Sequence, residues 1–214
     1  LGYNDFLNRE AYAELLLFNS SAMADGKELT SLEGYVSRLK RDQKEIYYLS
    51  GPGREAVELS PHLEVFRKKG LEVLFLYEPV DEFILDALKT YKDCQFKPAE
   101  HVQFEDLKRY EDAETPETQA DPLAEDDRDV LDRLLARVKD LLGDKVTAVR
   151  VSERLTDSPS CLVSPDGVTS QMQKIFQVMS KDSSVPAKIF EVNQDHGLIR
   201  NLLRIFKADP ADPY

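Results

Sequence analysis

Two apolar runs without polar alternation constrain the fold of this chain most. EIYYLS (residues 45–50) and LEVLFLY (residues 71–77) place apolar side chains on both faces of a strand. Such strands suit a sheet that is covered on both sides, which is usually parallel. Between them, Ser60 is a predicted N-cap, Pro61 suits a first helical position and Gly70 suits a helix end. The pattern predicts a βαβ unit with a right-handed crossover.

Further helices and one strand are expected around this unit. Residues 8–19 have helical periodicity, and Thr30 with Glu33 forms a predicted capping box at the start of a second helix. After Pro79 the apolar residues recur at helical spacing as far as Tyr91, and HVQFEDL (101–107) is typical of a short third strand. The first part of the chain is therefore expected to contain two helices followed by a βαβα unit.

The turn after the first strand allows two interpretations. Gly51, Gly53 and Ala56 fit the G-x-G-x-x-G/A pattern of a dinucleotide-binding turn, and Glu78 stands where a ribose-binding carboxylate is expected. However, a pyrophosphate site needs a long helix after the glycines, and here Ser60-Pro61 interrupts the helix within two turns. We therefore favour a structural strand-to-helix turn, with a nucleotide-binding α/β enzyme as the alternative.

An acidic stretch divides the chain. Residues 111–129 carry nine acidic residues against one basic residue, with two prolines, so this stretch cannot bury much apolar surface. We predict two domains, 1–112 and 125–214, joined by a flexible acidic linker at 113–124.

The second domain is expected to be mixed α/β, with a three-stranded sheet and amphipathic helices, so that the whole chain is of the α+β class. The predicted strands are 145–152, 160–164 and 187–193, and the predicted helices begin near Asp126, after Thr169 and at 197. SERLTDSPSC holds Ser152, Asp157, Ser158 and Ser160, but a nucleophilic serine needs a base and no histidine is near in sequence. We interpret this segment as turn chemistry. The acid pairs in VDEF and EDD are interpreted as solvated faces and helix caps.

Composition excludes several classes of function. A net charge of -12 argues against nucleic-acid and anionic-membrane partners, and no apolar run reaches the length of a membrane span. Cys94 and Cys161 are too few for a disulfide framework or a zinc site, and the start of the chain has no signal-peptide pattern, so a cytoplasmic protein is expected. His62, His101 and His196 lack the spacing of metal ligands. No catalytic, cofactor or metal site is predicted.

One helix carries a candidate binding surface. Met172, Ile175, Phe176 and Met179 recur at i, i+3, i+4 and i+7, which places them on one stripe of the helix after Thr169. Taken alone, such a stripe is more often packed against a core. Flexible thioethers also suit a surface that accepts many partners.

Several long phrases resemble one family. QKEIYYLSG, SPHLEVFRKKGLEVLFLYEPVDEFILDAL, SERLTDSPSCLV and FEVNQDHGLI closely resemble the 90-kDa heat-shock chaperones in their bacterial form, in order along nearly the whole chain. The resemblance implies the end of a middle domain, with a helical coil followed by a small α/β/α subdomain, and the start of a C-terminal domain without its final dimerisation helices.

The same resemblance implies a function. It suggests an intact homodimeric chaperone that remodels non-native client proteins, using ATP and magnesium bound in an N-terminal domain that lies outside this sequence. It also implies that the helix with Met172, Ile175, Phe176 and Met179 contacts clients, which reverses the core interpretation. A pure dimerisation module remains a further alternative, and it predicts a stable dimer at micromolar concentration.

The acidic linker generates a first prediction. Ordering a residue costs ~1–2 kcal/mol, and residues 111–124 have few apolar side chains to offset that cost. Limited proteolysis followed by mass spectrometry should therefore give first cuts within 111–124 and two resistant pieces. First cuts within 45–90 would show that the domain boundary is wrong.

Overall fold

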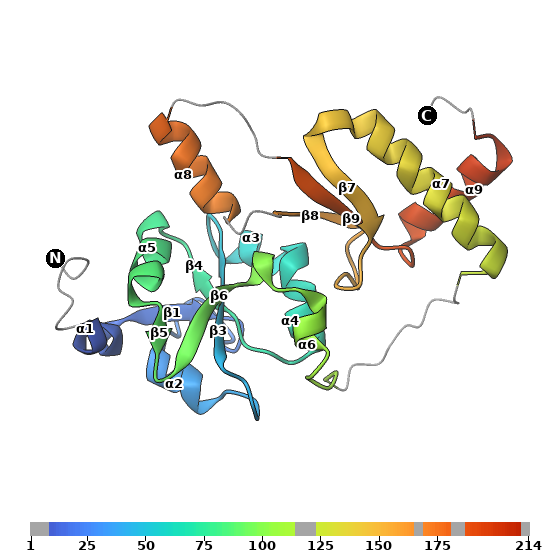
Figure 1. Cartoon of the computed structure of the whole chain (residues 1–214). Helices are drawn as coiled ribbons and strands as arrows, with labels where there is room; N and C mark the ends of the chain where they lie inside the picture. Colours follow the sequence, from blue (N-terminus) through green and yellow to red (C-terminus); the bar gives the residue numbers. More distant parts are fainter. Residues whose placement is uncertain (1–8, 114–122, 165–168, 181–186, 211–214) are drawn as a thin grey trace.

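The computed structural model describes residues 9–113, 123–164, 169–180 and 187–210. These residues form two sheets, each with its own helices, which lie side by side (Figure 1). We call residues 9–113 the N-terminal unit and residues 123–210, with the gaps just given, the C-terminal unit. The mixed α+β class is confirmed. Apart from Ala113, Leu123 and Ala124, the predicted linker 113–124 lies outside the described residues.

The sheet of the N-terminal unit has six strands in the order β2-β1-β4-β3-β6-β5. The strands are β1 (Leu17–Ser20), β2 (Thr30–Ser31), β3 (Glu45–Ser50), β4 (Leu74–Leu76), β5 (Thr90–Tyr91) and β6 (Cys94–Pro98). The central strand β3 pairs in parallel with both β4 and β6, while β1 pairs antiparallel with β4. The predicted parallel βαβ unit is confirmed.

Helices cover both faces of this sheet. The helices are α1 (Arg9–Leu15), α2 (Leu32–Ser37), α3 (Arg54–Glu58), α4 (Glu64–Lys68), α5 (Pro79–Leu88) and α6 (Phe104–Leu107). Tyr47 and Leu49 of β3 pack into one core with α3, α4 and α6. Ile46 and Tyr48 pack into a second core with α1, α2 and α5. The lack of polar alternation in β3 follows from this double cover.

Three local predictions in the N-terminal unit are wrong. Residues 8–19 do not form one helix, because α1 ends at Leu15 and residues 17–20 form β1. Pairing with the neighbouring strands β2 and β4 outweighs helical periodicity there. Residues 101–107 form a turn and helix α6, since the third parallel strand is β6. Of the expected helical coil, α1 and α2 remain as short helices on one face, while β1 and β2 pair into the sheet.

The third error is a shift of one residue in a helix cap. Ser31, not Thr30, caps α2, and its side chain accepts a hydrogen bond from Gly34 N at 3.1 Å. The other predicted helix-start and helix-end residues are confirmed. Ser60 Oγ accepts from His62 N next to Pro61, and Gly70 has a φ of 57° after α4, a left-handed conformation that glycine adopts without strain.

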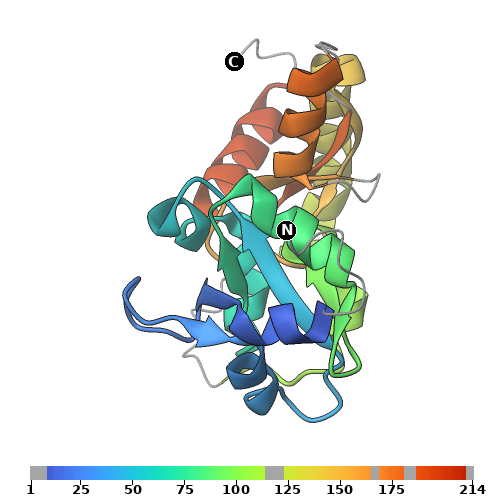
Figure 2. The same cartoon turned by 90° about the vertical axis from the view of Figure 1, so that its left-hand side faces the viewer.

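The C-terminal unit is built on a three-stranded sheet of order β7-β9-β8. Its elements are α7 (Glu125–Leu142), β7 (Val146–Val151), β8 (Ser160–Val163), α8 (Ser170–Ser180), β9 (Lys188–Val192) and α9 (Gly197–Ala208). All three strands match the prediction. Helices α7 and α9 pack on one face of the sheet and enclose a separate apolar core. The other face of the sheet and α8 turn toward the N-terminal unit (Figures 1 and 2).

Tyr35 of α2 ties a helix to the central sheet through its hydroxyl. The ring is 1% exposed, and the hydroxyl donates to Glu72 O at 2.7 Å and accepts from Tyr47 N at 3.0 Å. Burial raises the pKa of this phenol, so it stays a donor at any physiological pH.

Replacement of Tyr35 by phenylalanine should therefore cost about 2 kcal/mol, because two buried backbone groups lose a partner. Urea unfolding measures this loss. Tyr12→Phe, at a tyrosine that is 37% exposed, is the matched control and should change stability by less than about 0.5 kcal/mol. Equal losses in the two variants would contradict a structural role for the Tyr35 hydroxyl.

Candidate functional site

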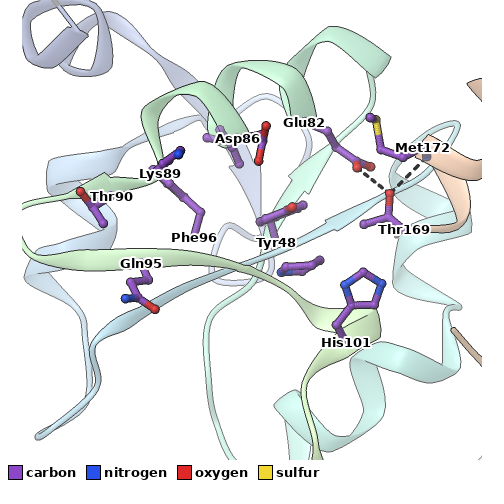
Figure 3. A pocket seen from close by; sticks show the side chains of 12 residues that line it. Tyr48, Glu82, Asp86, Lys89, Thr90, Gln95, Phe96, His101, Thr169 and Met172 are labelled. Carbon is purple, nitrogen blue, oxygen red and sulfur yellow. Dashed lines mark hydrogen bonds between the residues drawn. The ribbon is translucent and has the colours of Figure 1, made fainter. Parts of the chain in front are cut away.

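A hollow of about 660 Å³ lies where α8 meets the N-terminal unit (Figure 3). One wall comes from β3, β6 and α5, and the first turn of α8 closes one end. We call this hollow the α5–α8 pocket. Its lining residues are Tyr48, Glu82, Leu85, Asp86, Lys89, Thr90, Gln95, Phe96, Pro98, His101, Thr169 and Met172.

Thr169 joins α8 to the pocket wall. Its hydroxyl accepts from Met172 N at 3.2 Å and donates to Glu82 Oε2 at 2.6 Å (Figure 3). Its carbonyl accepts from Gln173 N at 2.9 Å. Thr169 is therefore the N-cap of α8, as its place before a helical run predicts, and the same hydroxyl binds a carboxylate of the N-terminal unit.

A second carboxylate meets the start of α8. Glu100 Oε2 accepts from Ser170 N at 2.9 Å and from Ser170 Oγ at 2.8 Å, and Lys188 Nζ donates to the same hydroxyl at 2.8 Å. The free N–H groups and the dipole at a helix N-terminus favour negative charge. Glu82 and Glu100 thus fix the first turn of α8 against the N-terminal unit.

The pocket combines apolar walls with polar groups that are shielded from water. Leu85 is fully buried, and Phe96 and Met172 are half-buried, so the pocket offers apolar contact. Glu82 is only 4% exposed, and this burial raises the pKa of its carboxyl, while the bond from Thr169 opposes the shift. Among the described residues, His101 Nε2 and Glu82 Oε1 are buried atoms without a hydrogen-bond partner.

The predicted contact stripe is described only in part. Met172 lines the pocket and Ile175 is half-buried one turn further along α8. Phe176 and Met179 lie on the same helix, but their side chains are outside the described part of the structure. The joint role of Met172, Ile175, Phe176 and Met179 therefore stays a prediction.

One predicted surface carboxylate is in fact buried. In VDEF, Asp81 caps α5 as expected, with its Oδ2 accepting from Glu78 N at 3.3 Å. Glu82, by contrast, faces the interior. The signal was available, because Glu82 and the core residue Leu85 are three positions apart and share one helical face. The sequence gives no sign of its partner Thr169, 87 residues away.

The glycine turn after β3 has a packing explanation. A side chain at Gly51 would place its Cβ 2.6 Å from Val57 Cγ2, so only glycine fits there. Helix α3 after the turn has five residues, too short to act as the long helix of a dinucleotide site. These contacts favour the structural interpretation of the turn.

The serine-rich loop after β7 shows the predicted turn chemistry. Ser152 Oγ accepts from Arg154 N at 3.2 Å and donates to Glu191 Oε2 at 3.0 Å. Within the described residues, no three His, Cys, Asp or Glu side chains converge as metal ligands. No helix in that part of the chain has the length and hydropathy of a membrane span.

Comparison with known proteins gives one consistent result. The family model described as Hsp90 protein matches residues 2–214. The chain belongs to the Hsp90 family. A chaperone protein HtpG of Nitratidesulfovibrio vulgaris is 53% identical over 214 residues, all of this chain. HtpG chaperones of Oleidesulfovibrio alaskensis and Geobacter metallireducens are 49% and 39% identical over 99% and 98% of it.

The match covers only part of those Hsp90 proteins. The chain spans 33% of the length of the Nitratidesulfovibrio and Oleidesulfovibrio relatives and 31% of the Geobacter relative. The α5–α8 pocket therefore belongs to a part that spans about one third of the length of these relatives.

The buried Glu82 carboxyl generates a pH-dependent prediction. Because its pKa is raised in the folded state, the folded protein binds this proton more tightly than the unfolded chain does. The resulting penalty is fully present above the raised pKa, and it is relieved as the pH falls through that pKa toward the unfolded value. Glu82→Gln removes the charge and should raise the melting temperature at pH 7.

The difference between Glu82→Gln and the unaltered chain should shrink as the pH is lowered to 5 and below, as followed by thermal unfolding. Asp86→Asn, at an exposed carboxylate one turn further along α5, is the control and should show no such trend. A Glu82→Gln variant less stable than the parent at pH 7 would show that the charged form contributes net stability.

Proposed function

We propose that this chain supplies the part of an Hsp90 chaperone that holds non-native polypeptide, and that the α5–α8 pocket is the contact site. The observation that carries this proposal is the position of Met172, which stands at the pocket wall beside Thr169 and Glu82 (Figure 3). The membership of the Hsp90 family and the chaperone names of the relatives support it.

The lining suits a ligand with both apolar side chains and exposed backbone. Phe96 and Met172, which are half-buried, can cover apolar groups of a non-native chain. A methionine has three rotatable bonds and a polarisable sulfur, so it adapts to differently shaped partners. His101, Gln95 and Asp86 provide donors and acceptors for backbone that has not yet formed its own hydrogen bonds. Non-native proteins share these needs whatever their sequence.

The remaining steps of the chaperone cycle belong to the intact protein. We propose that ATP and magnesium bind in the two thirds of the relatives that this chain does not match. The 214 residues of this chain would then contain no nucleotide site of their own. We also propose a cytoplasmic homodimer as the working form, with neither nucleic acid nor membrane as a partner. The net charge of -12 supports the last point.

A serine substitution at Met172 tests the pocket. It removes apolar contact and flexibility while the helix cap at Thr169 stays in place. We expect affinity for a fluorescein-labelled, permanently unfolded polypeptide to fall about fivefold, because losing part of one methionine's burial costs ~1 kcal/mol. Fluorescence anisotropy measures the affinity.

The matched control is Met23→Ser. Met23 is also half-buried but lies in the N-terminal unit outside the pocket lining. It should leave the affinity for the unfolded polypeptide unchanged. If Met172→Ser and Met23→Ser bind that polypeptide with equal affinity, the α5–α8 pocket is not the contact site.

A further inference from the structure

The two units meet through three buried carboxylates of the N-terminal unit. Glu82 and Glu100 hold the start of α8, and Glu64 of α4 reaches the loop between β7 and β8. Each is at most 6% exposed. Glu64 differs from the other two because it binds the consecutive backbone N–H groups of a single loop.

The Glu64 carboxylate is surrounded by backbone donors. Its Oε2 accepts from Thr156 N at 2.6 Å and from Asp157 N at 2.9 Å, and its Oε1 accepts from Ser158 N at 3.0 Å. The Thr156 hydroxyl adds a longer contact to Oε2 at 3.4 Å. Successive N–H groups that converge in this way form a concave site for an anion.

The loop receives its shape from the C-terminal unit itself. Asn193, after β9, donates through Nδ2 to Thr156 O and to Ser158 O, both at 3.2 Å. Its backbone N–H donates to Pro159 O at 2.8 Å. Asn193 is 5% exposed. It therefore binds the carbonyl groups of the loop on one side, while the N–H groups on the other side are left for Glu64.

We propose that Glu64 is a positioning residue that sets how the C-terminal unit docks on the N-terminal unit, and thereby where α8 stands across the α5–α8 pocket. The hydrogen bonds to these three N–H groups are part-buried, and Glu64 is the acceptor that the structure describes for each of them. Without the carboxylate, the three donors lose the partner that fixes the loop to α4, and the loop is free to turn toward water for a new one. Strand β8 begins at Ser160, directly after this loop. Displacement of the loop therefore also moves β8, which precedes α8 in the sequence.

The docking claim stands without the proposed function, whereas its consequence for client binding rests on it. The test uses the whole 214-residue chain with Glu64→Ala, Glu64→Gln and Asn193→Ala. Glu58→Ala is the control, because Glu58 pairs with Arg54 within the N-terminal unit. The first measurement is hydrogen exchange of the amides of residues 156–158 by NMR.

The second measurement reports docking directly. Nitroxide labels at Lys44→Cys and Asp140→Cys, both exposed positions on different units, give a distance distribution by pulsed electron paramagnetic resonance. The native Cys94 and Cys161 are buried and are therefore poor labelling sites. Affinity for the unfolded polypeptide is the third measurement.

We expect Glu64→Ala to accelerate exchange of the three amides at least about tenfold and to broaden the label distances, with smaller effects in Glu64→Gln. Added formate should enter the space left in Glu64→Ala and restore protection, which a general loss of stability would not allow. Asn193→Ala should accelerate exchange of the same three amides, because Asn193 supports their loop from within the C-terminal unit. Glu58→Ala should change nothing.

Unchanged exchange and unchanged label distances in the Glu64 variants would overturn the proposal. If Glu64→Ala does not fold, Glu64→Gln and Asn193→Ala decide by the same measurements. Altered docking with unchanged polypeptide affinity would support the positioning role and contradict the pocket function. Reduced polypeptide affinity with unaltered docking would overturn the positioning role instead.

Discussion

A buried ion pair between the central strand of the C-terminal sheet and the loop after β7 fixes how the two units meet. Arg154 and Glu191 are both 4% exposed, with Arg154 Nε 3.1 Å from Glu191 Oε2. The same guanidinium donates to Val102 O of the N-terminal unit at 3.1 Å. Removing one partner of such a pair costs ~3–5 kcal/mol, because the other charge stays buried. An arginine side chain has five N–H donors in a fixed plane. Arg154 can therefore bind Glu191 of its own unit and the backbone of the N-terminal unit at the same time.

The surroundings of Glu191 show how this charge is kept in the interior. Arg150, Arg154 and Ser152 donate to its two oxygens, and the Cys161 thiol lies 3.9 Å away. Burial and the nearby carboxylate raise the pKa of the Cys161 thiol to about 12, so this cysteine remains a protonated donor. A buried ion pair contributes little net stability compared with apolar packing, but its geometry admits few alternatives. The pair therefore restricts how the loop after β7 can sit.

Local sequence predicts the elements well and their polar partners poorly. Strands β3, β7, β8 and β9 and helices α5, α7 and α9 follow from apolar periodicity with proline and glycine punctuation, which are properties of neighbouring residues. Strand β1 could not be predicted this way, because its conformation depends on β4, more than 50 residues away. The same limit applies to the site. Met172 was found from helical spacing. Glu64, Glu82 and Glu100, by contrast, accept hydrogen bonds in the interior from donors that lie 70 to 94 positions away in the sequence.

The two units keep their apolar cores apart. Each of the four clusters of buried apolar residues in the described part of the chain draws its members from one unit only. The described bonds between the units are polar: Glu64, Glu82, Glu100 and Arg154 form buried or part-buried ones, and Lys108 and Glu153 form an exposed ion pair. Water can replace polar partners when such an interface opens. An interface of this kind combines a defined docked geometry with the capacity to separate, and the α5–α8 pocket, which has walls from both units, exists in full only in the docked state.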